Sequence, residues 1–211
     1  MDKKARIFLI RHGQPEQHCG KIILGQYDTP LSEIGKSEAE TAAEKLAGEG
    51  ARIKRIYTSD LKRAIQTAEI IAEKFGNVPV FQVAAFREVA MGEWDGVLIE
   101  DIKAKFPEEY ARRGEDIINY RIPGGENFFD LNSRVIKAFH RIIKEDFQEA
   151  DEDPGDLVIV AHIGVLSVLN DKFMNKNTGD SFLEIDFPTG SVTVYDVCDW
   201  RGDCRIQAAV S

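Results

Sequence analysis

The amino-acid sequence predicts a three-layer α/β/α sandwich with a mostly parallel central sheet. Apolar runs at residues 7–10 and 157–161 are continuous rather than alternating, which is typical of strands covered by helices on both faces. Segments of helical period alternate with the predicted strands, as in layered α/β folds. Near the end of the chain, alternating strands at residues 191–197 and 205–210 flank a turn, so part of the sheet is expected to be antiparallel.

The composition bounds the class of protein. Because 43% of the 211 residues are hydrophobic, the chain can build a substantial core, and we predict a single domain over residues 1–211. A formal net charge of −9 disfavours nucleic acid and anionic lipid as partners. No apolar run approaches the roughly 18 residues that span a bilayer, so we expect a soluble, cytoplasmic protein. Any anionic substrate must then be captured by a local positive pocket.

The cysteines argue against a disulfide scaffold and against a zinc site. There are three of them, Cys19, Cys198 and Cys204, which is an odd number without metal-ligand spacing. A bridge between Cys198 and Cys204 across the predicted C-terminal hairpin stays open. The oligomeric state is open as well, with a homodimer among the alternatives.

The first strand, at residues 7–10, stops abruptly at Arg11, His12 and Gly13. Residues 14–27 have neither a helical nor a strand period and form a predicted loop over the end of this strand. A turn and a helix cap follow at residues 28–32, and Gly48 and Gly50 end the helix. The predicted apolar face of this helix comprises Ile34, Ala39, Ala42, Ala43 and Leu46.

The next strand, at residues 52–58, alternates and is predicted to be half-buried. Ser59 or Asp60 is expected to cap the helix that follows, and Gly76 ends it. Its apolar stripe is formed by Leu61, Ala64, Ile65, Ala68, Ile71, Ala72 and Phe75. Arg63 falls in the first turn of this helix, just beyond a strand end.

The second half begins with a short strand at residues 78–83 and an irregular, glycine-rich segment at residues 86–96. Helical segments interrupted at Pro107 continue through Arg113, and a Pro-Gly-Gly-Glu break at residues 123–126 precedes a long helix. Its predicted apolar positions are Leu131, Val135, Phe139, Ile142, Ile143 and Phe147.

The acidic run at residues 149–156 is predicted to be a solvated turn. The strand at residues 157–161 then repeats the opening pattern, because it ends in His162 and is followed by Gly164 and an apolar helix through Met174. The hairpin turn at residues 200–203 joins the last two strands.

Ionisable side chains follow three of the predicted strands: Arg11 with His12, then Arg63, then His162. Ligands of α/β sheets bind beyond the carboxyl ends of strands, so these side chains converge if the strands are neighbours. Forked guanidinium groups suit phosphate oxygens. A neutral imidazole can attack phosphorus, and a second imidazole, if protonated, can donate to a phosphoryl oxygen. Phosphoryl transfer needs mainly positioning and charge stabilisation, which this set supplies without a metal or cofactor.

A leaving alkoxide also needs a proton. Glu88 precedes the glycine-rich loop and can act as the general acid if burial or neighbouring negative charge raises its pKa. His140, within the long helix, is expected to be structural or exposed rather than catalytic.

The chain resembles the histidine phosphatase superfamily, also called the phosphoglycerate mutase-like family, through five motifs in the family's order. They are Leu9-Ile10-Arg11-His12-Gly13, Asp28-Thr29-Pro30-Leu31-Ser32 with Gly35, Ser59-Asp60-Leu61-Lys62-Arg63-Ala64 with Thr67-Ala68, Glu88 with Gly92, Trp94 and Gly96, and Val160-Ala161-His162-Ile163-Gly164. The resemblance implies that His12 carries a transient phosphohistidine and that Arg11, Arg63 and His162 hold the phosphate. It also implies that Glu88 protonates the leaving group and then helps to activate water.

The chain departs from the common family pattern near the first motif. Many relatives have His-Gly-Glu-Thr followed three residues later by asparagine, whereas this chain has Gln14, Pro15 and, at the asparagine position, His18. His18 could replace the asparagine at phosphate. Mutases usually have a glutamine before the glycine where this chain has Leu24 and Gly25. The substrate-binding candidates are Gln14, His18, Leu24, Gly25 and Ile163.

Two segments look more like the α-ribazole phosphatase branch, a group of cobalamin-pathway enzymes. They are residues 24–28 and the set formed by residues 123–126, 130–131 and 134–135. The leading hypothesis is therefore a metal-independent phosphomonoesterase for a small phosphorylated metabolite, such as α-ribazole 5′-phosphate. A cofactor-dependent phosphoglycerate mutase is the first alternative, although mutases typically carry a longer capping insertion. The alternative from another class is a non-catalytic phospho-ligand binding protein.

Overall fold

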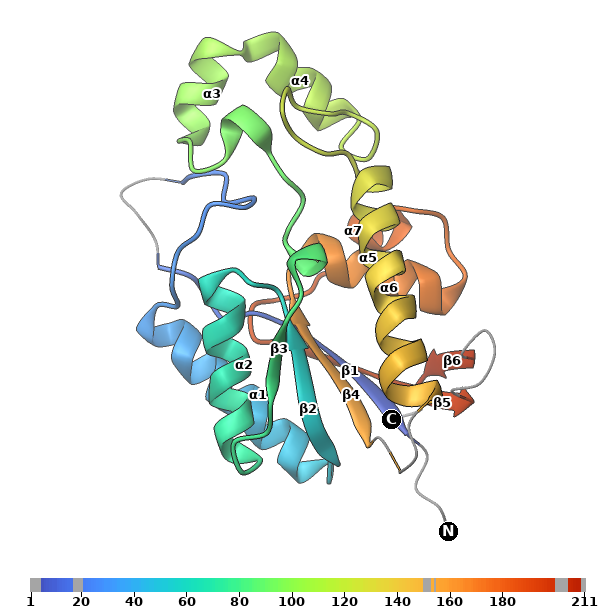
Figure 1. Ribbon diagram of the computed structural model, residues 1–211. Coiled ribbons are helices and arrows are strands. Elements are labelled where there is room, and N and C mark those ends of the chain that lie inside the picture. The colour runs from blue at the N-terminus through green and yellow to red at the C-terminus, as the bar shows by residue number, and fades with distance from the viewer. Residues whose placement is uncertain (1–4, 17–20, 150–152, 154, 200–204, 210–211) are drawn as a thin grey trace.

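The computed structural model describes residues 5–16, 21–149, 153, 155–199 and 205–209. Within this part, six strands form one sheet in the order β3-β2-β4-β1-β5-β6 (Figure 1). Their bounds are β1 (Arg6–Arg11), β2 (Ile53–Thr58), β3 (Val80–Gln82), β4 (Asp156–Ala161), β5 (Val192–Asp199) and β6 (Arg205–Ala208). Strands β3, β2, β4 and β1 are parallel, whereas β5 runs antiparallel to β1 and β6 antiparallel to β5. The predicted mostly parallel sheet with an antiparallel part is confirmed.

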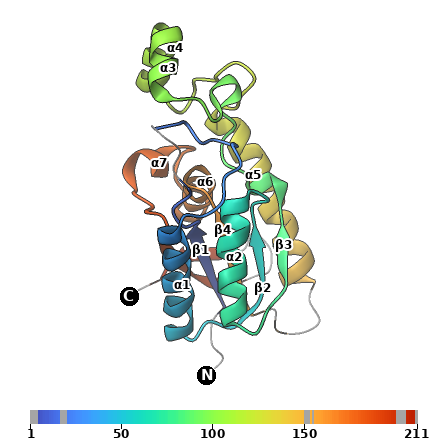
Figure 2. The same cartoon turned by 90° about the vertical axis from the view of Figure 1, so that its left-hand side faces the viewer.

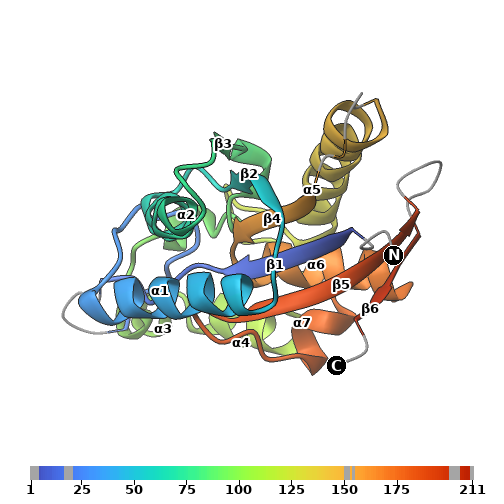
Figure 3. The same cartoon turned by 90° about the horizontal axis from the view of Figure 1, so that it is seen from below.

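Two pairs of long helices cover the two faces of this sheet (Figure 3). Helices α1 (Glu33–Gly48) and α2 (Lys62–Lys74) pack on one face, and α5 (Phe128–Ile143) and α6 (Ile163–Met174) pack on the other. The shorter elements are η1 (Ala84–Phe86), η2 (Gly92–Trp94), α3 (Ile99–Lys105), α4 (Pro107–Glu115), η3 (Lys144–Gln148) and α7 (Asp180–Glu184). The predicted three-layer sandwich is therefore confirmed.

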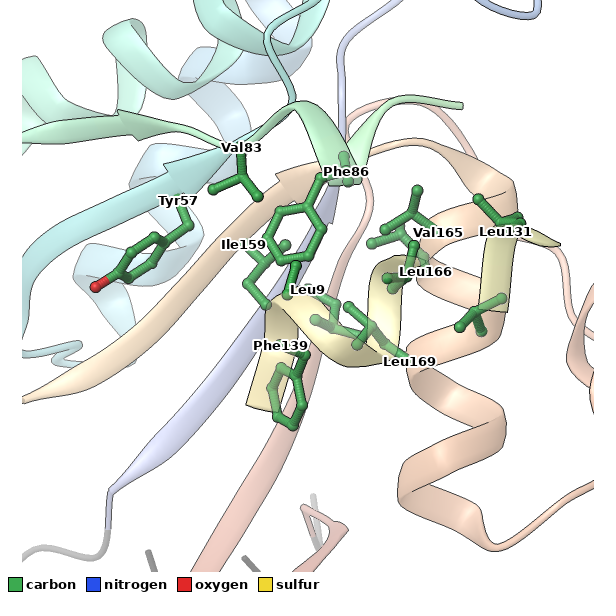
Figure 4. Packing of buried hydrophobic residues seen from close by; sticks show 14 of the residues in the cluster. Leu9, Tyr57, Val83, Phe86, Leu131, Phe139, Ile159, Val165, Leu166 and Leu169 are labelled. Atoms are coloured by element: carbon green, nitrogen blue, oxygen red, sulfur yellow. The ribbon is translucent and has the colours of Figure 1, made fainter. Parts of the chain in front are cut away.

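The central strands β1 and β4 are buried because alternate side chains enter the two helical layers. Phe8 and Ile10 of β1 join the cluster beneath α1 and α2. Leu9 and Ile159 join the opposite cluster, where Figure 4 shows them beside Phe139 of α5. Continuous apolar runs in β1 and β4 thus serve two cores at once, as their sequence pattern predicts.

Helices α3 and α4 stand beyond the carboxyl ends of the parallel strands (Figures 1 and 2). Helix α4 has no buried residue, while α3 contributes buried Ile102. The ring of Tyr110 on α4 lies 6.2 Å from that of Trp94, the last residue of η2. The predicted helical segments interrupted at Pro107 are these two helices.

Two burial predictions are wrong. Ile34 is 61% exposed because it lies off the helical face of α1 that is buried, which comprises Gly35, Ala39, Ala42, Ala43 and Leu46. The end of β2 is fully buried rather than half-buried, with Ile56, Tyr57 and Thr58 all inside. This strand lies between β3 and β4 and is covered on both faces, which its alternating sequence conceals.

The predicted cap of α2 is also wrong. The N-cap position is Leu61, which provides no side-chain bond. Instead, Asp28 Oδ1 accepts the backbone N–H of Lys62 at 2.7 Å, so a residue remote in sequence satisfies this helix end. Asp60 is unavailable because Arg87 holds its carboxylate through two bonds of 2.7 and 2.6 Å.

The end of the acidic run is not solvated. Asp156 begins β4, is fully buried and forms an ion pair of 3.0 Å with Arg6. Helix α7 was not among the elements expected from sequence. Cys198 is exposed on β5, while Cys19, Cys204 and the predicted turn at residues 200–203 lie outside the described residues.

Candidate active site

The predicted site residues come together because their strands are neighbours. His12 directly follows β1, and its backbone N–H donates to the carbonyl of Ala161, the last residue of β4, at 3.0 Å. His162 is the next residue, and the two imidazole ring centres lie 4.9 Å apart. Arg63 comes from the start of α2, which follows β2 on the other side of β4. The expected convergence at one edge of the sheet is therefore what the fold produces.

The contacts of His12 identify which ring nitrogen carries the proton. Nδ1 lies 2.8 Å from the carbonyl oxygen of Gly13, and since a carbonyl only accepts, Nδ1 carries the proton. Nε2 then has the lone pair, and it accepts a bond from Nε of Arg63 at 3.3 Å. Burial, followed by the charges of Arg63 and Arg11, holds the pKa of His12 well below its usual range. His12 is consequently a neutral imidazole with Nε2 available to attack an electrophile.

Arg63 is buried and tied to a neighbouring loop. Its Nη1 donates to the carbonyl of Tyr27 and its Nη2 to that of Gly25, both at 2.8 Å. Gly25 has φ +45°, and a Cβ at this residue would lie 1.9 Å from Asp95 Oδ1, so the loop needs glycine here. Two carbonyl dipoles thus orient a guanidinium whose third nitrogen faces His12.

Arg11 and His162 retain unused hydrogen-bonding groups. Nη1 of Arg11 donates to the carbonyl of Phe187 at 2.5 Å, but its buried Nε has no partner among the described residues. Both ring nitrogens of fully buried His162 lack a partner there too. Since buried polar groups are nearly always paired, these atoms point to a polar ligand at this place.

His162 is expected to be neutral before any ligand binds. Burial, then the proximity of His12 and Arg63, lowers its pKa well below the usual value. The sequence-based suggestion of a protonated second imidazole is therefore not met in this state. A neutral imidazole still carries one N–H, which suffices to donate one hydrogen bond.

The carboxylate of Glu88 lies at the start of α6. It accepts the backbone N–H of Val89 at 2.9 Å and that of Gly164 at 3.2 and 3.3 Å to its two oxygens. Burial raises the pKa of Glu88, and this effect outweighs the opposing backbone bonds and the charges of Arg63 and Arg11. Glu88 thus favours the protonated form more than an exposed glutamate does, as a general acid requires.

The weaker candidates are not all at this centre. Gln14 bonds to Ser32 through its side-chain and backbone oxygens, both at 3.1 Å, and so binds the start of α1. Gly25 contacts Arg63 through its carbonyl, as described above. Leu24 and Ile163 are half-buried, and they are the sequence neighbours of Gly25 and His162. His18 lies outside the described residues, and exposed His140 is on α5. Substrate binding by these residues stays a prediction.

Sequence reasoning assigned no role to two residues that hold the site in place. Thr67 accepts the backbone N–H of Gly13 at 3.0 Å and donates to the carbonyl of Arg63 at 2.8 Å, linking two motifs. Arg134 binds the segment before Glu88 through backbone carbonyls. Every residue has a backbone carbonyl, so the sequence does not reveal which carbonyls accept these bonds. Thr67 and Arg134 themselves are among the motif residues of the family resemblance.

No group of three or more His, Cys, Asp or Glu side chains in the part of the chain that the structure describes is placed to hold a metal ion. Nor does the described part contain a helix of the length and apolar character that a membrane span requires.

Comparisons with known proteins agree with the geometry. Residues 7–208 match the sequence pattern of the histidine phosphatase superfamily (branch 1). Phosphoglycerate mutase-like protein 4 of Arabidopsis thaliana is 33% identical over 170 residues, covering 80% of this chain and 70% of that protein. Glucosyl-3-phosphoglycerate phosphatase of Mycobacterium tuberculosis is 33% identical over 167 residues, covering 78% and 73%.

A solved structure, the alpha-ribazole phosphatase from Shigella flexneri, superposes with a TM-score of 0.82 over 97% of this chain and 95% of that one. At 23% identity this likeness demonstrates a shared fold. The family pattern extends over nearly the whole chain and includes the predicted site residues that meet at the carboxyl ends of β1, β2 and β4. The chain therefore belongs to the histidine phosphatase superfamily (branch 1).

Proposed function

We propose that this protein is a metal-independent phosphomonoesterase that works through a phosphohistidine at Nε2 of His12. The observation that carries the proposal is the state of His12: a neutral ring whose lone pair faces Arg63, beside the unpaired donors of Arg11 and His162. A phosphate dianion satisfies those donors, and its phosphorus becomes the electrophile for Nε2. Guanidinium and imidazole groups supply the stabilising charge.

The reaction has two steps with balanced proton transfers. In the first, a P–N bond forms at Nε2 of His12 while the P–O ester bond breaks, and Glu88 gives its proton to the departing oxygen. In the second, the Glu88 carboxylate takes a proton from water, which attacks phosphorus and breaks the P–N bond. Inorganic phosphate leaves, and both residues return to their initial states.

The proposed substrate is a small phosphorylated metabolite. The sequence motifs make α-ribazole 5′-phosphate the first compound to test, and the name of the M. tuberculosis relative adds glucosyl-3-phosphoglycerate. Beside the single turn of η2, the segment between Glu88 and α5 carries two short helices, α3 and α4, of 7 and 9 residues. This modest size favours hydrolysis over the mutase alternative.

The direct test is phosphate release by the wild type and by His12→Ala from a panel that also contains 3-phosphoglycerate and phosphoserine. We expect the wild type to release phosphate and the variant to lose at least about 1,000-fold in kcat/KM, because the nucleophile is gone. The wild type should also form a phosphoenzyme that is labile in acid and stable in alkali. An unchanged rate in His12→Ala contradicts the proposal, and interconversion of phosphoglycerates without release identifies a mutase.

A second test concerns the proton donor. Glu88→Gln should slow phenyl phosphate far more than p-nitrophenyl phosphate, because p-nitrophenolate departs without protonation. The two substrates share a phenyl ring, so a difference between them reports on the chemistry of the leaving group rather than on how the substrate binds. The measured quantity is kcat/KM, which covers the steps up to phosphoenzyme formation. Equal losses on both substrates would remove Glu88 from the role of acid.

A further inference from the structure

Arg134 of α5 grips the main chain on the N-terminal side of Glu88. Its Nη1 donates to the carbonyls of Ala85 and Arg87 at 2.7 and 2.8 Å, and its Nη2 donates to the carbonyl of Glu88 at 2.9 Å. Three backbone oxygens within four residues thus converge on one guanidinium. A planar, five-donor group can hold such an arrangement, whereas an ammonium cannot.

Glu126 completes the grip on the C-terminal side. Its carboxylate accepts from Nε of Arg134 at 2.8 Å and from Nη2 at 2.7 Å, a bidentate pair. The same carboxylate accepts the backbone N–H of Ala90 at 3.0 Å, and the N–H of Glu126 donates to the carbonyl of Ala90 at 2.9 Å. The pair therefore clamps residues 85–90, with Glu88 inside the clamped segment.

All of the donors of Arg134 are engaged in this clamp. The guanidinium has five N–H groups, and the structure gives it five hydrogen bonds, two to Glu126 and three to backbone carbonyls. Arg134 therefore has no donor left for a substrate phosphate, in contrast to Arg11. The side chains of Arg134 and Glu126 are each only 21% exposed, so water competes weakly for these bonds.

We propose that Glu126 and Arg134 are positioning residues for Glu88: by fixing the backbone of residues 85–90, they aim its carboxyl group at the leaving oxygen. The inference rests on the proposed function, because it needs Glu88 to be the proton donor. It gives the Pro-Gly-Gly-Glu motif and Arg134 a task in catalysis that they perform without touching substrate.

The test uses Arg134→Lys, which keeps the positive charge and removes the planar guanidinium group with its five donors. We expect kcat/KM for phenyl phosphate to fall about 10- to 100-fold, as small misplacements of reacting groups do, with little change for p-nitrophenyl phosphate. Glu126→Gln, which keeps the size of the side chain, should show the same selectivity to a smaller extent. This second variant also provides the test if Arg134→Lys does not fold.

The double variant Glu88→Gln/Arg134→Lys separates positioning from general support of the fold. If Arg134 acts through Glu88, the double variant is no slower on phenyl phosphate than Glu88→Gln alone. Arg121→Lys is the matched control, because Arg121 forms an exposed ion pair of 2.5 Å with Asp130 at the start of the same helix. It should leave both substrates unchanged.

The outcomes distinguish the two levels of the proposal. The positioning role is overturned, and the proposed function stands, if Glu88→Gln shows a selective loss but Arg134→Lys and Glu126→Gln lose equally on both substrates. Additive losses in the double variant lead to the same conclusion. A non-selective loss in Glu88→Gln itself overturns the acid role, and the positioning role with it.

Discussion

His12 and His162 stand close together in a buried, electropositive place, where adding a proton to either is unfavourable. Burial is the largest cause of the lowered pKa of each ring, and the neighbouring Arg63 adds to it. In the folded state both rings therefore stay unprotonated at pH values at which an exposed histidine binds a proton. A neutral His12 keeps the Nε2 lone pair that the proposed mechanism uses, and the suppressed proton uptake makes the stability of the protein depend on pH in a definite direction.

We expect the free energy of unfolding to fall as the pH is lowered from 7 to 5. Histidine in the unfolded chain titrates near a pKa of about 6.5, so over this range the unfolded chain binds protons that folded His12 and His162 refuse. Each of these two sites therefore makes stability rise with pH, by at most about 1.4 kcal/mol per pH unit, whereas Glu88, whose pKa burial raises, contributes in the opposite direction. His162→Gln removes one site, so urea unfolding should show a smaller difference between pH 7 and 5. Equal pH dependence in the variant and the wild type would contradict this account.

At the scale of elements, the start of α6 shows how a glycine allows a buried carboxyl group, that of Glu88, to approach a helix end closely. Gly164 donates its backbone N–H to Glu88, and a Cβ there would lie 2.4 Å from Glu88 Oε1 and 3.0 Å from Leu131 Cδ2. A Cβ contact of this length requires a shift of the carboxylate. Gly164 is thus needed because the Glu88 carboxylate approaches it closely, rather than because of an unusual backbone angle.

Gly164→Ala should consequently behave as a partial loss of Glu88. We expect kcat/KM for phenyl phosphate to fall about 10-fold or more, with a smaller effect on p-nitrophenyl phosphate, because the acid is displaced while His12 is untouched. Gly48→Ala is the control, since a Cβ at this helical position meets nothing within 4 Å. It should keep full activity and gain up to about 1 kcal/mol of stability. Undiminished turnover of phenyl phosphate by Gly164→Ala would refute the role given to close approach.

The elements themselves were largely predictable from sequence because their hydrophobic periods are strong. The apolar runs of β1 and β4 and the stripes of α2 and α5 each point to one structure. Helix ends were harder, because partners can come from far along the chain. Asp28 caps α2 although it lies 34 residues before Lys62 in sequence. The partner of the buried Asp156 is Arg6, which lies 150 residues away in sequence. Local sequence contains no record of such pairings.

At the scale of the whole molecule, the difference between local sequence patterns and long-range contacts explains how much of the site could be predicted. Side chains that follow parallel strands must meet at one edge of the sheet, so Arg11, His12, Arg63 and His162 were identifiable from their positions. The loop that orients Arg63 acts through carbonyls, and the clamp formed by Arg134 depends on how α5 packs. These contacts arise only once the layers assemble.

The assembled site should bind inorganic phosphate and thereby stabilise the whole fold. The unfolded chain lacks the convergence of β1, β2 and β4, so phosphate binds the folded state alone. At a concentration 100 times its Kd, phosphate adds about 2.7 kcal/mol, which corresponds to a rise in Tm of roughly 5–10 °C for a chain of this size. Differential scanning calorimetry in phosphate, against sodium chloride of equal ionic strength, measures this shift.

Two further measurements connect that shift to the proposed anion site. Arg11→Gln should reduce it, because Arg11 carries a buried donor with no partner among the described residues. EDTA should change neither the shift nor the turnover of phenyl phosphate, since guanidinium and imidazole groups hold the anion. A shift that EDTA abolishes and a divalent metal restores would show that the charge comes from a metal instead. A full shift in Arg11→Gln would place the anion elsewhere on the molecule.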